Sequence, residues 1–261
     1  MRRQSAIVSS RVAEIIRDEQ AVLAAAALAD PADLQLYGLA VQRCASIDDA
    51  ASACLQLSAD EWARRDVGNL AAWSAVMSSA HRRGDWAAAD SALARASSAT
   101  SLRRPTQLVA SAQAAGLPPD LPVLSRLLLQ AASTTLLGSS SDETQAQRAI
   151  CSKERVSDVN LAQDCERFTS NLVERASTLT DFHEAAVLGG ALGWPDARLA
   201  DLRRRRAAAT DGVDPVLGGG GDPRQILSCD VAEARAGYLA DMGEVGEIGA
   251  LQRARQQRRP P

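Results

Sequence analysis

Alanine makes up 51 of the 261 residues of this chain, whereas aromatic residues are only 3%. Alanine has the highest intrinsic helix propensity, and β-sheets depend on aromatic and β-branched side chains that are scarce here. The composition therefore predicts an all-α protein and argues against a β-sandwich or a β-barrel. A chain of this length buries about 70% of its unfolded surface, which is enough for a core without stabilising cross-links.

Apolar residues recur at helical spacing along the chain, and capping residues divide the pattern into short helices. A first helix is expected over residues 8–28, and Asp30 with Pro31 is expected to cap and begin the second helix. The segment 58–61 (Ser-Ala-Asp-Glu) reads as a capping box before a short helix, and residues 181–184 (Asp-Phe-His-Glu) read as another.

Residues 69–99 carry the clearest helical pair. A helix is followed by a turn at Gly84 and Asp85, and a second helix follows the turn. Two helices joined by so tight a turn must pack antiparallel. The residues expected on one face of the second helix are Trp86, Ala89, Leu93 and Ala96.

This segment resembles a tetratricopeptide repeat (TPR). Trp73 matches the first conserved position and Val76 the leucine that follows, while Gly84 matches the turn between the helices. The segment departs from the pattern where Met77 and Ala80 replace the usual residues, and no proline closes it. The resemblance implies an irregular right-handed stack of antiparallel helix pairs, a TPR-like α-solenoid.

The resemblance also implies a non-enzymatic scaffold that binds a peptide or partner protein. Ligands of the family usually contact the first helix of each repeat, which points here to Ser74, Ser78, His81 and Arg82. Some members clamp a peptide carboxylate with an asparagine and a lysine. Ala75 stands at the asparagine position, so a free carboxyl terminus is not the predicted ligand.

Segments rich in proline, glycine and serine, which interrupt helices, suggest how the chain is divided into regions. We expect an N-terminal helical region over 1–137, a C-terminal one over 143–209, a glycine-rich linker over 210–222, and a terminal helix with a disordered tail over 223–261. Within the first region, the prolines and glycine of residues 103–119 suggest a connection, and an apolar helix is expected from 120 to 137.

No catalytic, cofactor or metal motif is recognisable. Lys153 is the only lysine, no P-loop tripeptide is present, and the two histidines, His81 and His183, lack zinc-site spacing. The net charge of −3 does not steer the chain toward nucleic acid, and the arginine run 203–206 is expected to be a solvated face. Two alternatives stay open: an enzyme whose site no motif reveals, and arginine-mediated nucleic-acid binding.

The cysteines and the start of the chain suggest different compartments. No signal-peptide core and no stretch long enough to span a bilayer is visible, which predicts a cytoplasmic protein. Cys44 with Cys54 and Cys151 with Cys165 form two close pairs, which are either buried thiols or disulfides. Without an export signal we favour thiols; disulfides would indicate a periplasmic protein whose start is incomplete.

Overall fold

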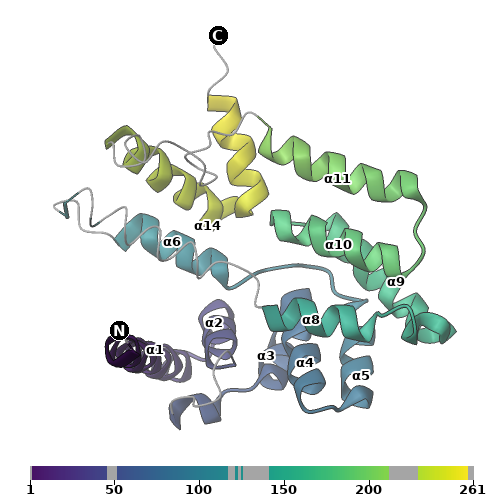
Figure 1. Ribbon diagram of the computed structural model, residues 1–261, viewed down its shortest axis with the longest axis horizontal. Helices are drawn as coiled ribbons and strands as arrows, with labels where there is room; N and C mark the ends of the chain where they lie inside the picture. The colour runs from purple at the N-terminus through teal and green to yellow at the C-terminus, as the bar shows by residue number, and fades with distance from the viewer. Residues whose placement is uncertain are drawn as a thin grey trace.

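The computed structural model describes residues 2–45, 52–116, 121–122, 125, 141–211 and 229–257. This part of the chain is all-α, as the composition predicted, with 11 α-helices, two 3-10 helices and no strand (Figure 1). Neighbouring helices pack in pairs, namely α1 with α2, α4 with α5, and α10 with α11. The elements are α1 (Arg2–Ala29), α2 (Leu34–Cys44), η1 (Ser52–Gln56), α3 (Ala59–Arg65), α4 (Leu70–Arg82), α5 (Trp86–Ala96), α6 (Thr106–Gly116), α8 (Ser141–Ile150), η2 (Arg155–Ser157), α9 (Val159–Glu174), α10 (Leu179–Ala191), α11 (Asp196–Thr210) and α14 (Cys229–Gln257).

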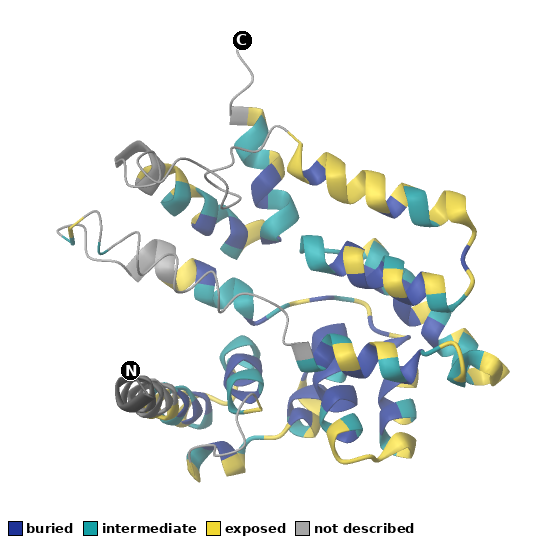
Figure 2. Ribbon diagram, viewed as in Figure 1, coloured by how far each residue is buried: buried dark blue, intermediate teal, exposed yellow. Residues whose placement is uncertain are grey.

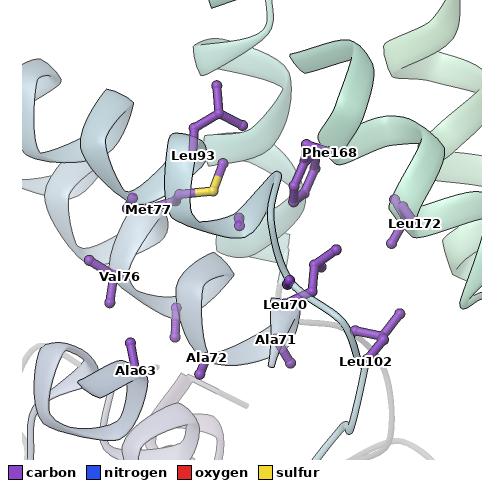
Figure 3. Close-up of a cluster of buried hydrophobic side chains, with 14 of the residues drawn as sticks. Ala63, Leu70, Ala71, Ala72, Val76, Met77, Leu93, Leu102, Phe168 and Leu172 are labelled. Atoms are coloured by element: carbon purple, nitrogen blue, oxygen red, sulfur yellow. The ribbon is translucent and has the colours of Figure 1, made fainter. Parts of the chain in front are cut away.

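Helix α4 lies at the centre of the main core. Nine of its 13 residues are buried, and α3, α5 and α8 all pack against it. A helix that is buried on most of its sides is stable only when other elements surround it. Figure 3 shows Met77 of α4 and Leu93 of α5 in one buried cluster with Phe168 and Leu172 of α9. Because this cluster extends from Ala27 to Leu202, both predicted helical regions contribute to one core.

The predicted turn between α4 and α5 is confirmed. Gly84 has a positive φ of 70°, and the Asp85 side chain accepts a hydrogen bond from the Ala88 N–H at 3.0 Å, which caps α5. Ala89 and Leu93 are buried, whereas Trp86, which was expected on the same face of the helix, is not. Its side chain is 42% exposed, because the first residue of a helix after a tight turn lies at the edge of the layer.

Two of the three predicted caps are displaced by one turn or less. Ser58 caps α3 as expected, accepting from the Glu61 N–H at 3.0 Å. The cap of α2 is Asp33, not Asp30, because the Asp33 carboxylate accepts from two free N–H groups of the first turn. The capping box of α10 pairs Thr178 with Asp181, so Asp181 occupies the third helical position and does not begin the helix.

Part of the segment predicted as a connection is helical. Helix α6 lies within residues 103–119, and its breakers, Pro105 and Gly116, stand at its ends where a helix tolerates them. It packs against α14 around a small second core of Ala110, Leu239, Met242 and Ala250.

Helix α14 (Cys229–Gln257) is bent at a glycine. Gly246 has φ 77° and ψ 172° inside the helix. The chain is helical on both sides of this bend, and α14 packs against α6. The predicted helix 120–137, most of the linker 210–222 and the end of the tail lie outside the described residues.

Two adjacent glycines of α10 differ in their surroundings. A Cβ atom on Gly189 would lie 2.4 Å from Cε3 of the Trp194 ring, whereas a Cβ atom on Gly190 would meet nothing within 4 Å. Gly189 therefore makes room for the buried Trp194 indole, and Gly190 has open space beside it.

We expect Gly189→Ala to lower the free energy of unfolding by about 1–3 kcal/mol, because the rigid indole must move. Gly190→Ala is the matched control, and it should leave stability unchanged or raise it by up to about 1 kcal/mol through helix propensity. Urea unfolding followed by circular dichroism measures both. Equal losses for the two variants would contradict this packing.

Both cysteine pairs are joined as disulfides in the structure. The Cα atoms are 5.5 Å apart in Cys44–Cys54 and 5.8 Å apart in Cys151–Cys165, each within the range that a disulfide requires. The structure therefore contradicts the preference for buried thiols. The first bridge ties η1 to the end of α2, and the second joins α9 to the end of α8.

Thiol labelling tests the two bridges. Of the five cysteines, only Cys229 lies outside the two pairs. In denaturant without reductant, we expect mass spectrometry to find one labelled thiol per chain, and five after reduction. Five labelled thiols before reduction would show that the cysteines are unpaired in the purified protein.

Candidate functional site

An open cavity of about 250 Å³ lies between α2 and the C-terminal half of α4. Its other walls are η1, the start of α3 and the start of α8, so we name it the α2–α4 groove. The Cys44–Cys54 disulfide forms part of its lining, together with Ser78, Ser79 and Arg82 of α4 and Arg83, which caps the end of α4.

The four predicted contact residues do not share one surface. Ser78 and Arg82 line the groove, although Ser78 is almost completely buried. Ser74 is 2% exposed and accepts a hydrogen bond from Gln147 of α8 at 3.3 Å. His81 turns toward α5, where its ring meets the Trp86 ring edge-on at 5.3 Å. Helix α8 thus covers the first half of the α4 face.

Exposed arginines and carboxylates face each other across the groove. Arg82 forms an ion pair with Asp142 at 3.4 Å, and Arg83 donates a hydrogen bond to Ser79 at 2.7 Å. Asp60 is a further charged residue in the lining. Because exposed ion pairs contribute little to stability, these side chains are free to exchange partners when a ligand approaches.

Glu143 is a buried carboxylate in the groove lining, and no motif in the sequence indicated it. It is 4% exposed and accepts a hydrogen bond from the Gln42 side chain at 2.9 Å. Burial raises the pKa of Glu143 above its ordinary value, and the Arg104 guanidinium lowers it to a smaller extent. Helical periodicity alone could not show that α8 inserts this acid against α2.

Glu143 belongs to a larger buried charge cluster. Arg104 donates to Asp181, and both side chains are almost fully buried. Asp181 also accepts from the Thr178 N–H at 2.8 Å and the Ser177 N–H at 2.9 Å. Such a pair is costly to break, since removing one partner leaves a buried charge without compensation. The cluster holds the start of α10 against the chain that enters α6.

We expect Glu143→Gln to be more stable than the wild type at neutral pH, by on the order of 1 kcal/mol. A raised pKa means that the folded state binds the proton more tightly than the unfolded state does. The contribution of Glu143 to wild-type stability is therefore fully present below the ordinary pKa and is lost as pH rises through the raised pKa.

Urea unfolding of both proteins at about pH 4 and pH 7.5 measures this difference. The glutamine can still accept the hydrogen bond from Gln42, so the variant mainly removes the charge. A wild type that gains stability relative to Glu143→Gln as pH rises would show that Arg104 outweighs the cost of burial.

A second open cavity, of about 460 Å³, lies between the outer faces of α10 and α11, and we name it the α10–α11 groove. It is lined by Phe182, His183, Ala186, Val187, Gly190, Leu199, Leu202, Arg203 and Arg206. The arginine run expected to be a solvated face thus borders a hollow. Figure 2 shows how much of α11 is exposed along its length.

Within the described ranges, no group of three or more His, Cys, Asp or Glu side chains could hold a metal ion. In the same part of the chain, none of the helices is both long and apolar enough to cross a membrane. No protein-family model, curated protein or solved structure matches this chain.

Proposed function

We propose that the protein is a non-enzymatic, TPR-like helical scaffold that binds an extended peptide of a partner protein in the α2–α4 groove. The α4–α5 hairpin is its clearest repeat, and the packed helix pairs around it form an irregular right-handed stack. The two disulfides support an oxidising compartment, such as the periplasm, as its place of work.

One observation carries this proposal. Ser78 and Arg82, chosen because the first helix of a TPR-like repeat contacts ligands, line an open groove together with α2, which lies earlier in the chain. Ser74 is not part of the proposed surface because α8 covers it. His81 lies at the hairpin end of α4, beside the groove.

The size and charge of the groove support a peptide over a small-molecule substrate. Ligand pockets for small molecules usually measure about 300–1,000 Å³ and enclose most of the ligand. This groove is smaller and open to solvent, which suits one or two side chains of a longer chain. Arg82 and Arg83 can pair with carboxylates of the peptide, and Asp60 can pair with a basic residue.

The proposal predicts that Arg82→Glu weakens peptide binding about tenfold, because it reverses a charge at the groove. A photoreactive phenylalanine analogue at position 79 first captures the partner, and mass spectrometry identifies the cross-linked segment. Fluorescence anisotropy with a synthetic peptide of that segment then gives the affinities of the wild type and the variant.

Arg95→Glu is the matched control, since Arg95 is an exposed arginine on α5 away from the groove. It should bind the peptide as the wild type does. A peptide whose affinity is the same for Arg82→Glu and the wild type would refute the groove as its binding site.

Glu143 supports a second candidate function, an enzyme without a recognisable motif. A buried carboxylate with a raised pKa is typical of general acids and bases, and this one lies beside a groove. Any turnover by such a site would be lost in Glu143→Gln while the fold is retained. The scaffold keeps peptide binding in the same variant.

A further inference from the structure

We infer that the α10–α11 groove is a second docking site, which receives a short amphipathic helix with acidic residues at one end. None of the residues that line it belongs to the α2–α4 groove. This site can therefore be tested independently of the proposed peptide site.

The lining positions have the spacing of a helix–helix seam. On α10 they fall at residues 182, 183, 186, 187 and 190, and on α11 at 199, 202, 203 and 206. Residues three or four apart lie on one face of a helix, so each wall is a continuous stripe about two turns long. Two stripes side by side form the groove into which a third helix packs.

The floor of the groove is apolar and open. Val187 is 38% exposed, although it is surrounded by the buried Phe182 and Leu202. A Cβ atom on Gly190 would meet nothing within 4 Å, so the approach to the floor is unobstructed. Small residues such as Ala186 and Gly190 let the axis of a docked helix come close to α10. Burial of these side chains supplies the apolar part of the binding energy.

The charge of the groove selects an acidic partner. His183, Arg203 and Arg206 line it, and none of its described lining residues is acidic. The described residues give Arg203 no salt bridge, and Arg206 lies near enough to Glu247 to influence its pKa. Because α10 and α11 form an antiparallel pair, Arg206 lies opposite His183 and Leu199 lies opposite Gly190. The basic residues therefore gather at one end of the groove, and the other end is apolar.

Charge also argues against a second copy of this chain as the occupant. A symmetric dimer through this groove would place the same patch on both sides. Depending on the direction of the two-fold axis, Arg203 and Arg206 of one copy would face either the same arginines or the apolar end of the other groove. Neither arrangement supplies a carboxylate, and a desolvated arginine without an acidic partner is unfavourable. An acidic helix of a different protein neutralises the arginines.

A displayed peptide library tests the inference without a known partner. Random 14-residue peptides on phage are selected on the full-length protein and counter-selected on Gly190→Trp, whose added side chain fills the groove. Peptides that bind elsewhere are removed in the second step. We expect the retained peptides to carry apolar residues at helical spacing, with glutamate or aspartate clustered near one end.

Fluorescence anisotropy then measures how the affinity of the retained peptides depends on the charges in the groove and in the peptide. Arg203→Glu with Arg206→Glu should weaken binding about tenfold, and replacing the peptide acids by lysine should restore it. Arg204→Glu is the matched control, because Arg204 is exposed on the same helix, pairs with Asp201 at 3.1 Å and does not line the groove.

Several results would overturn the inference. They are an absence of peptides after counter-selection, retained peptides that are neutral or basic, and an equal loss of affinity in Arg204→Glu. A single-stranded oligonucleotide that binds more tightly than the peptides, and is released by any of the three arginine changes, would assign the surface to nucleic acid. Concentration-dependent dimers that Gly190→Trp dissociates would assign it to a second copy.

Discussion

The burial of most of α4 is the constraint on which the rest of the structure depends. Three helices pack around it, and they approach closely because alanines such as Ala72, Ala75 and Ala80 face them. Small side chains contribute little apolar area each, so many neighbouring helices must share one core to reach adequate stability. This requirement brings α8 and α9 of the second half of the chain onto the hairpin of the first half.

The same packing decides which part of α4 is available to a ligand. Helix α8 covers Ser74 and brings Gln147 and Glu143 with it, which leaves only the C-terminal half of α4 open beside α2. The buried pair of Arg104 and Asp181 fixes the start of α10 nearby. The two grooves are consequently different in character: one is small and of mixed charge, and the other is longer, apolar at its floor and basic at one end.

Local signals in the sequence were sufficient for the helical hairpin and for much of the helix pattern. Gly84 and Asp85 specify their turn through backbone conformation and side-chain capping, both of which act within a few residues. The exact caps were harder to predict, because Asp30 and Asp33 are both capable of capping and the choice depends on packing. Helix α6 was not predicted because its proline and glycine, Pro105 and Gly116, lie at its two ends. From the sequence alone, such residues at the end of a helix look the same as residues in a loop.

The sequence by itself determined the all-α class, the α4–α5 hairpin, two of the groove residues and the absence of recognisable catalytic motifs. Only the tertiary structure decided which cysteines meet, that Glu143 is buried beside a groove, and that Arg203 and Arg206 border an apolar hollow. The physical reason is the distance along the sequence over which each interaction acts. Propensity and capping act between residues close in sequence, whereas burial, pKa and charge complementarity depend on which distant segments come into contact.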